Sequence, residues 1–281
     1  MTLEDFIQES ERRLKEGNLH FSHYKDHASQ LVLRTLDLNP TQFFLKKNDK
    51  LNSSELEKLN HVLQRRLSGE PLQYILGFEY FYESKFEVGP GCLIPRKETE
   101  QLVDEVLAHQ PPQNLKVAEL GAGSGNIGIS VLLKRPKIHW HAFEINPKSA
   151  QYAKKNIRDL LPGENNYFLH GEDFFSGIKR FSPFDLLVSN PPYISSREFE
   201  ELPLEVRQEP DLALKAGEEG LDVIRKLIGS LSEVLKPGGL FLCEIASSQG
   251  ELLKSELGKS GKKFEVLRDL AGLPRILKLD F

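Results

Sequence analysis

Hydrophobic residues follow two different periodicities along the chain, and the change falls near residue 75. Before that point, apolar residues recur at the three- to four-residue spacing of amphipathic helices. They are Leu3, Phe6, Ile7, Leu14, Leu31, Val32, Leu36, Leu56, Leu59, Val62, Leu63 and Leu67. Ser54 with Glu57 three residues later forms a capping-box pattern, and Gly69 can close that helix. Residues 1 to about 70 are therefore predicted to form a small helical bundle.

Residues 76–92, LGFEYFYESKFEVGPGC, alternate aromatic and polar side chains and end in Gly-Pro-Gly. This alternation is typical of a β-hairpin, here one that bridges two domains. We therefore expect a helical domain over 1–75, a hairpin and linker over 76–97, and a second domain over 98–281.

After residue 97, short apolar segments alternate with helical patterns. The candidate strands are LKVAEL, IHWHAFEI, YFLHGE, FDLLVS, LFLCEI, FEVLRDL and RILKLDF. Between them, Asn146 can cap a helix that has Pro147 in its first turn, and the helical stripe of residues 218–235 ends at KPGG. The alternation predicts an α/β fold with a mostly parallel sheet and helices on both faces. Such sheets bind ligands at the carboxyl ends of their strands.

Composition narrows the class of protein. With 281 residues, one large or two unequal domains are expected. The net charge of −4 argues against a general nucleic-acid binder. Cys92 and Cys243 lie far apart and match no metal-binding spacing, so we expect two reduced thiols and no metal. The N-terminal sequence is not a signal peptide, and no apolar run reaches membrane-spanning length, which together predict a cytoplasmic protein without a membrane partner.

A glycine-rich segment follows the first predicted strand of the second domain. In AELGAGSGNIGIS (118–130), Gly121, Gly123 and Gly125 would let backbone N–H groups approach a ligand at the start of a helix. Glu144 stands 23 residues after Gly121, at the end of the next strand, where its carboxylate could accept both hydroxyls of a ribose. A dinucleotide-binding fold shares this spacing, and a tight turn with no ligand remains an alternative.

The apolar segment FDLLVS leads directly into Asn190, Pro191, Pro192 and Tyr193. The prolines fix φ and supply no backbone donors, and Pro191 directs Asn190 away from helical geometry. The result is a stiff loop that presents one amide and one phenol ring. The alternative is an ordinary turn at a strand end, because Asn-Pro is a common turn dipeptide.

The pairing of GAGSG with NPPY resembles class I S-adenosylmethionine-dependent methyltransferases that modify planar nitrogen. GEPLQYILG, LIPRKETE, SNPPYI and AGLPRILKL narrow the resemblance to the release-factor glutamine methyltransferase family (PrmC/HemK) over most of residues 60–281. The resemblance implies five N-terminal helices, a hairpin and a Rossmann-like seven-stranded sheet with one antiparallel strand near its end. Glu119, Ala122, Glu144 and Phe174 stand where the family often has Asp, Thr, Asp and Trp.

The resemblance also implies the site. Its catalytic and substrate-binding residues are Asn190, Pro191, Pro192 and Tyr193, and its S-adenosylmethionine-binding residues are Gly121, Ala122, Gly123, Ser124, Gly125, Glu144, Asp173, Phe174 and Asn190. The Asn190 side-chain oxygen and the Pro191 carbonyl would accept the two N–H bonds of a substrate amide, and Tyr193 would pack against that amide. Residues 121–125 would line the methionine and ribose, Glu144 the ribose diol, and Asp173 with Phe174 the adenine. Arg96 either contacts substrate or caps a helix, and is left outside the catalytic set.

The function implied is N5-methylation of the glutamine in the Gly-Gly-Gln loop of peptide chain release factors. The enzyme would be a monomer that needs no nucleic acid, and its helical domain would dock the release factor. Three alternatives stay open: methylation of a ribosomal-protein glutamine, methylation of an amino group in nucleic acid, and a regulator that binds the cofactor without catalysis. Residues 195–217 are either a substrate-facing loop or a plain surface insertion.

Overall fold

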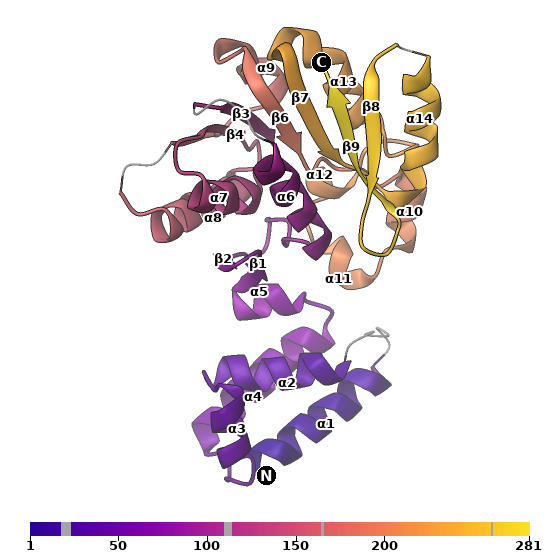
Figure 1. Ribbon diagram of the computed structural model, residues 1–281. Helices are drawn as coiled ribbons and strands as arrows, with labels where there is room; N and C mark the ends of the chain where they lie inside the picture. The colour runs from indigo at the N-terminus through magenta and orange to yellow at the C-terminus, as the bar shows by residue number, and fades with distance from the viewer. Residues whose placement is uncertain (18–23, 110–113, 164–165, 260) are drawn as a thin grey trace. The chain divides into compact units, whose positions relative to one another are not determined.

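The computed structural model describes residues 1–17, 24–109, 114–163, 166–259 and 261–281. The chain separates into two compact units (Figure 1). The helical unit consists of Met1–Phe78 together with Leu202–Gln208, and the sheet unit consists of Glu79–Glu201 together with Glu209–Phe281.

The helical unit is built from helices, most of which contribute apolar residues to one core. Its helices are α1 (Leu3–Glu16), α2 (Tyr24–Thr35), α3 (Pro40–Lys46), α4 (Ser53–Leu67), α5 (Leu72–Leu76) and the short α11 (Leu204–Arg207). Phe6, Leu14, Leu31, Leu59 and Leu63 are among the buried residues of this core. The predicted helical bundle is confirmed.

The start of α4 differs from the prediction. The side chain of Asn52 accepts the Glu55 N–H at 3.0 Å, and the Glu55 carboxylate accepts the Asn52 N–H at 2.9 Å. The capping box is therefore Asn52 with Glu55, two residues before the predicted pair of Ser54 and Glu57. Asn caps helices as well as Ser does, so the earlier residue closes the first turn and Ser54 lies within it.

Segment Leu202–Gln208 joins the helical unit through a buried arginine. Arg66, whose side chain is fully buried on α4, forms an ion pair with Glu205 and donates to the carbonyl oxygen of Glu70 at 2.8 Å. Burial lowers the pKa of the Arg66 guanidinium, and Glu205 opposes that shift. A segment far along the sequence is thus an integral part of the helical unit.

The predicted hairpin is confirmed as β1 (Phe78–Phe81) paired with β2 (Ser84–Glu87). Its aromatic residues do not all face solvent, because Phe81 and Phe86 are buried and meet edge to face, with ring centroids 6.0 Å apart.

The sheet unit contains a seven-stranded sheet in the order β5-β4-β3-β6-β7-β9-β8. The strands are β3 (Lys116–Leu120), β4 (His139–Phe143), β5 (Tyr167–His170), β6 (Phe184–Ser189), β7 (Leu235–Glu244), β8 (Lys263–Arg268) and β9 (Pro274–Asp280). All neighbours are parallel except β9, which is antiparallel to β7 and to β8. The predicted α/β fold is confirmed. The segment KPGG is predicted to break the chain before this strand. It lies instead inside β7, at a register shift against β6.

Helices cover both faces of the sheet, as the strand pattern predicted (Figure 1). The α6 (Glu100–Ala108), α7 (Asn126–Lys134) and α8 (Pro147–Leu160) helices pack on one face, and α9 (Phe174–Gly177), α13 (Asp222–Val234) and α14 (Gly250–Gly258) on the other. Successive residues of β6 point to opposite faces of the sheet. Leu186 and Val188 lie in the core shared with α6, α7 and α8, and Leu187 lies in the core shared with α9, α13 and α14. The remaining α-helices of the described residues are α10 (Ser196–Glu201) and α12 (Asp211–Leu214), and short 3-10 helices cover Lys97–Thr99, Ile178–Arg180 and Ser247–Gln249.

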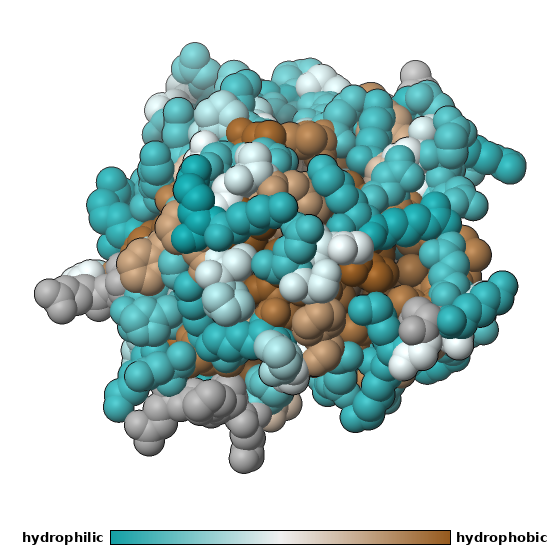
Figure 2. All heavy atoms as spheres, turned by 90° about the horizontal axis from the view of Figure 1, so that it is seen from above, coloured by the Kyte–Doolittle hydropathy of each residue, from teal (hydrophilic) through white to brown (hydrophobic). Residues whose placement is uncertain are grey.

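Polar side chains dominate the face of the molecule seen in Figure 2, with apolar residues visible in patches between them. Several large apolar side chains are exposed, among them Ile145, Leu212 and Leu270. Within the described ranges, no helix is both long enough and apolar enough to cross a membrane.

The order in which the chain adds strands to the sheet reverses at the centre of the sheet. From β3 the chain proceeds to β4 and β5 on one side, and then to β6 on the other side. The loops after β3 and β6 therefore leave neighbouring strand ends in different directions, and a crevice for a ligand opens at such a point. GAGSG follows β3 and NPPY follows β6.

Candidate active site

A pocket opens at this carboxyl edge of the sheet. Of the residues predicted from the sequence to form the site, seven line it: Gly121, Gly123, Glu144, Asp173, Phe174, Asn190 and Pro192. Apolar side chains complete much of the wall, including those of Leu93, Phe143, Ile145, Phe175, Leu212 and Val223. The pocket combines a few polar groups with a mainly apolar wall, which is the usual character of a small-molecule site.

The glycine loop has a backbone that residues with side chains rarely adopt. Gly121, Gly123 and Gly125 all have positive φ, at 73°, 56° and 82°. Gly125 precedes the first residue of α7, so the loop leads straight into a helix N-terminus. The N–H groups of Gly121 and Ala122 both donate to the carbonyl oxygen of Phe143, at 2.9 and 3.1 Å. These bonds fix the loop against the end of β4.

Ala122, Ser124 and Gly125 shape the loop and do not line the pocket. Ala122 is buried in the core between the sheet and α6–α8. The Ser124 hydroxyl is fully buried and donates to the Asn126 side-chain oxygen at 3.1 Å, while the Ser124 carbonyl accepts from Asn156 at 2.9 Å. Their assignment as cofactor-binding residues remains a prediction.

Glu144 is buried at the end of β4 and faces the pocket. Its two oxygens accept the backbone N–H groups of Gly123, at 2.8 Å, and of Asn146, at 2.7 Å. Burial raises the pKa of Glu144, and the two backbone donors oppose that shift. Because Asn146 also caps α8, through a bond of 3.0 Å from the Lys148 N–H, one short segment orients both the carboxylate and the helix.

Asp173 and Phe174 meet the pocket where α9 begins. Asp173 is the N-cap of α9, and its carboxylate accepts the Ser176 N–H at 3.0 Å. The buried ring of Phe174 meets that of Phe143 edge to face, with centroids 5.3 Å apart. The two rings give this part of the wall flat apolar surfaces.

The NPPY loop is tied to the end of β3. The Ser189 hydroxyl donates to the Leu120 carbonyl at 3.0 Å. A Cβ atom added to Gly121 would lie 3.9 Å from the backbone oxygen of Asn190. The two sequence motifs therefore meet at the same end of the sheet.

Two family models match the chain: "PrmC N-terminal domain" over residues 5–77 and "Methyltransferase small domain" over residues 97–206. The "Release factor glutamine methyltransferase" of Neisseria gonorrhoeae is 36% identical over 253 residues, covering 90% of this chain and 92% of that protein. The protein of the same name from Moorella thermoacetica is 34% identical over 278 residues, covering 98% and 97%. The chain belongs to the release factor glutamine methyltransferase family.

The fold also has solved counterparts. A methyltransferase from Pyrococcus furiosus matches with a TM-score of 0.51 and 17% identity, over 69% of this chain and 87% of that one. Membership of the release factor glutamine methyltransferase family confirms the resemblance drawn from LIPRKETE, SNPPYI and AGLPRILKL. It also confirms that the enzyme class is protein-(glutamine-N5) methyltransferase.

Tyr193 turns toward a buried carboxylate that the sequence reasoning missed. Its hydroxyl donates to Glu244, at the end of β7, at 3.1 Å, and its ring packs against the core beneath α13. Burial and the neighbouring Glu244 raise the pKa of Tyr193. Gln249 donates to the Tyr193 carbonyl at 2.9 Å and to the Gly220 carbonyl at 2.9 Å. Both the backbone and the side chain of Tyr193 are therefore hydrogen-bonded. Tyr193 is not part of the pocket wall.

Arg96 stands at the N-cap position of the short 3-10 helix Lys97–Thr99, where its carbonyl oxygen accepts the Thr99 N–H at 3.1 Å, but its side chain makes no capping hydrogen bond and does not line the pocket. It forms an ion pair with Glu209, which is almost completely buried and also accepts the Ile94 N–H at 2.9 Å. Residues 195–217 contribute Pro210, Leu212 and Ala213 to the pocket, so part of this segment faces the site. In the part of the chain that the structure describes, no cluster of His, Cys, Asp and Glu could hold a metal ion.

Proposed function

We propose that this protein transfers the methyl group of S-adenosylmethionine to the glutamine nitrogen in the Gly-Gly-Gln loop of peptide chain release factors. The observation that carries the proposal is that Asn190 and Pro192 line the same pocket as Gly121, Gly123 and Glu144. A cofactor held by the glycine loop and an amide held by NPPY would then meet at one edge of the sheet.

The residues present fit this cofactor. Each oxygen of Glu144 accepts one backbone N–H and keeps lone-pair capacity for a ribose hydroxyl. The rings of Phe143 and Phe174 offer flat apolar surfaces for an adenine. The backbone around Gly121 and Gly123 admits a ligand without side-chain obstruction. When bound, the cofactor supplies an electrophilic methyl group on a positively charged sulfur.

The NPPY loop would then act on the substrate amide. An amide nitrogen is a poor nucleophile because its lone pair is delocalised into the carbonyl, and no side chain is basic enough to deprotonate it first. The Asn190 side-chain oxygen and the Pro191 carbonyl would accept its two N–H bonds and align the nitrogen with the methyl group. They would also stabilise the positive charge that develops as the N–C bond forms and the C–S bond breaks. The proton leaves to water afterwards.

The helical unit carries the docking function in this proposal. A Gly-Gly-Gln loop alone offers little surface, whereas specific protein complexes usually bury about 1,200–2,000 Å². The helical unit has its own core and matches the family's N-terminal domain over residues 5–77. We assign release-factor binding to it and methyl transfer to the sheet unit, in a monomer that acts in the cytoplasm.

A substrate panel tests the proposal. The protein is incubated with methyl-labelled S-adenosylmethionine and, separately, with a purified release factor, a ribosomal protein that carries a methylatable glutamine, and DNA. Label on the release factor alone, lost when its Gly-Gly-Gln glutamine is changed to asparagine, is the expected result. Label on the ribosomal protein or on DNA in preference to the release factor would overturn the proposed substrate, and no label on any of them would overturn the activity.

A further inference from the structure

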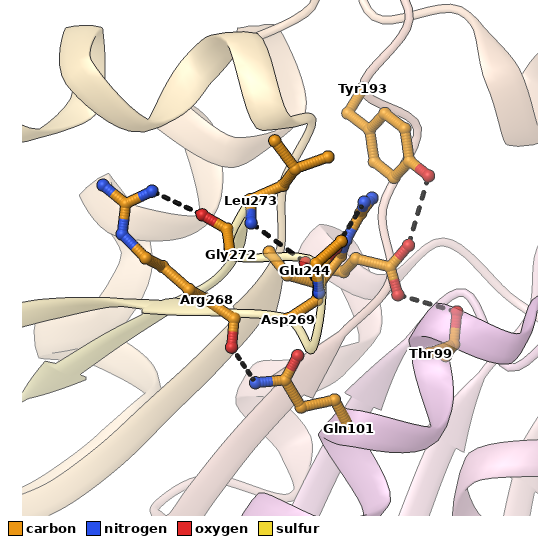
Figure 3. Close-up of polar contacts among 10 residues, drawn as sticks. Thr99, Gln101, Tyr193, Glu244, Arg268, Asp269, Gly272 and Leu273 are labelled. Atoms are coloured by element: carbon orange, nitrogen blue, oxygen red, sulfur yellow. Dashed lines mark hydrogen bonds and ion pairs between the residues drawn. The ribbon is translucent and has the colours of Figure 1, made fainter.

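Four polar side chains near the NPPY loop form one continuous hydrogen-bonded chain. The Asn190 side-chain nitrogen donates to the Thr99 hydroxyl at 3.0 Å. The Thr99 hydroxyl donates to one oxygen of Glu244 at 2.7 Å, and the Tyr193 hydroxyl donates to the other at 3.1 Å (Figure 3). Thr99 lies in the turn before α6, Glu244 ends β7, and the other two residues follow β6. Three segments far apart in sequence therefore join in one hydrogen-bonded chain that ends at the Asn190 amide.

This chain lies in the interior. Glu244 is 1% exposed and Thr99 is 2% exposed. Removing a carboxylate from water is costly unless both of its oxygens are hydrogen-bonded, and here both are. An apolar contact could hold α6 against β7 at lower cost, so a buried carboxylate at this position calls for a further role.

The order of donors along the chain determines how the Asn190 amide is oriented. When Glu244 is ionised it only accepts hydrogen bonds, so the single proton of the Thr99 hydroxyl points to Glu244. Thr99 then offers only lone pairs to Asn190, which must present its NH₂ group to Thr99. The Asn190 side-chain oxygen is thereby turned away from Thr99 and is available to a ligand.

We propose that Thr99 and Glu244 are positioning residues that fix the orientation of the Asn190 amide, so that its oxygen and not its nitrogen meets the substrate. This inference rests on the proposed function, in which that oxygen accepts an N–H bond of the substrate amide. With the amide reversed, an NH₂ group would face the NH₂ group of the substrate. The contact would then repel the positive charge that develops on the substrate nitrogen.

Protonation of Glu244 would loosen this arrangement. Burial raises the pKa of Glu244 and nearby Glu98 adds to the rise, whereas the hydrogen bonds from Thr99 and Tyr193 and the charge of Arg275 oppose it. A protonated Glu244 can donate to Thr99, and the Thr99 proton is then free to turn toward Asn190 and favour the reversed amide. Activity should therefore fall as the pH falls through the pKa of Glu244.

The first test needs no substrate. Water exchange of the Asn190 side-chain NH₂ is measured by NMR, with the signal assigned by its loss in Asn190→Ala. Thr99→Val removes the hydroxyl at nearly constant shape, and Thr99→Ser keeps it. We expect exchange roughly tenfold faster in Thr99→Val than in wild type, the equivalent of one hydrogen bond, and near wild type in Thr99→Ser. Equal exchange in wild type and Thr99→Val would overturn the inference.

The second test is kinetic. Thr99→Val should lower kcat for release-factor methylation roughly tenfold without changing the Kd for S-adenosylmethionine. Thr99→Ser should restore kcat, and Glu244→Gln should lower kcat and remove the acid limb of the pH profile that Glu244 causes. Ser230→Ala is the matched control, because that hydroxyl donates only within α13, to the Leu227 carbonyl.

The outcomes separate the two proposals. Unchanged kcat in Thr99→Val, or a loss of kcat that Thr99→Ser does not restore, would overturn the positioning role. Absence of methyl transfer by the wild-type protein would overturn the proposed function, and the NMR comparison would still decide the orientation of Asn190.

Discussion

The backbone N–H of Gly123 donates a hydrogen bond of 2.8 Å to the side chain of Glu144. The bond joins the loop after β3 to the end of β4 and leaves the carboxylate at the pocket wall. Glu144 therefore has two tasks: it shapes the glycine loop, and in our proposal it holds the ribose of the cofactor.

Glu144→Ala is expected to weaken S-adenosylmethionine binding. Charge-assisted hydrogen bonds contribute about 1.5–3 kcal/mol, so Kd should rise about 10- to 150-fold. Glu144→Asp, which keeps the charge, should lose much less. Isothermal titration calorimetry measures both, and an unchanged Kd in Glu144→Ala would leave this residue with the loop-shaping task alone.

The buried carboxyl group of Glu119 should make the stability of the folded protein depend on pH. Burial raises its pKa from 4.5 to about 8, although the Trp140 ring N–H donates to it at 2.6 Å. The folded protein therefore keeps a proton that the unfolded chain releases. The resulting stabilisation is complete below about pH 4.5 and is lost as the pH rises to about 8, at ~1.4 kcal/mol per pH unit.

Glu119→Gln has no such proton to lose. Urea denaturation of both proteins across this range should show wild-type stability falling relative to the variant as the pH rises. Parallel stability curves would mean that Glu119 is ionised in the fold.

The ion pair between Arg96 and Glu209 indicates that Arg96, whose role the sequence left open, stabilises the fold. The Glu209 side chain is 2% exposed, so Arg96→Met would remove an ion pair from a buried carboxylate. We expect a loss of about 1–3 kcal/mol in the free energy of unfolding. Lys97→Met is the control, because Lys97 is 84% exposed and should lose less than about 0.5 kcal/mol. Equal losses in the two variants would contradict the structural role of Arg96.

A truncated chain that begins at Glu79 tests whether the helical unit binds the release factor while the sheet unit transfers the methyl group. It should bind S-adenosylmethionine but methylate full-length release factor with a much lower kcat/KM. Truncation also removes Arg66, the partner of Glu205, so a thermal melt must first show that the shortened chain is folded. A folded truncation with the full-length kcat/KM would show that the helical unit is not the docking element.

The sequence predicted the sheet because buried parallel strands are continuous apolar runs. FDLLVS became β6 with the same bounds, and Asn146 caps α8 as expected. Errors occurred where two local signals competed: Asn52 and Ser54 can both cap a helix, and a Pro-Gly-Gly segment can break a strand or bulge within it.

Buried carboxylates were the main omission. Glu209 and Glu244 look like ordinary surface residues in the sequence, because their partners Arg96 and Thr99 lie 113 and 145 residues away. No local pattern records such a distance. The motif SNPPYI pointed to Asn190 and Tyr193, but the residues that support them could be found only once the strands were placed side by side.

The central claim is that Asn190 accepts the substrate amide during methyl transfer. Single-turnover mass spectrometry of a release factor, with S-adenosylmethionine and excess enzyme, tests it directly when wild type and Asn190→Ala are compared. We predict one methyl group on the Gly-Gly-Gln glutamine with wild type, and a rate lower by roughly 10²–10³ in Asn190→Ala with nearly unchanged cofactor affinity. Methylation of that glutamine by Asn190→Ala at the wild-type rate would contradict the account.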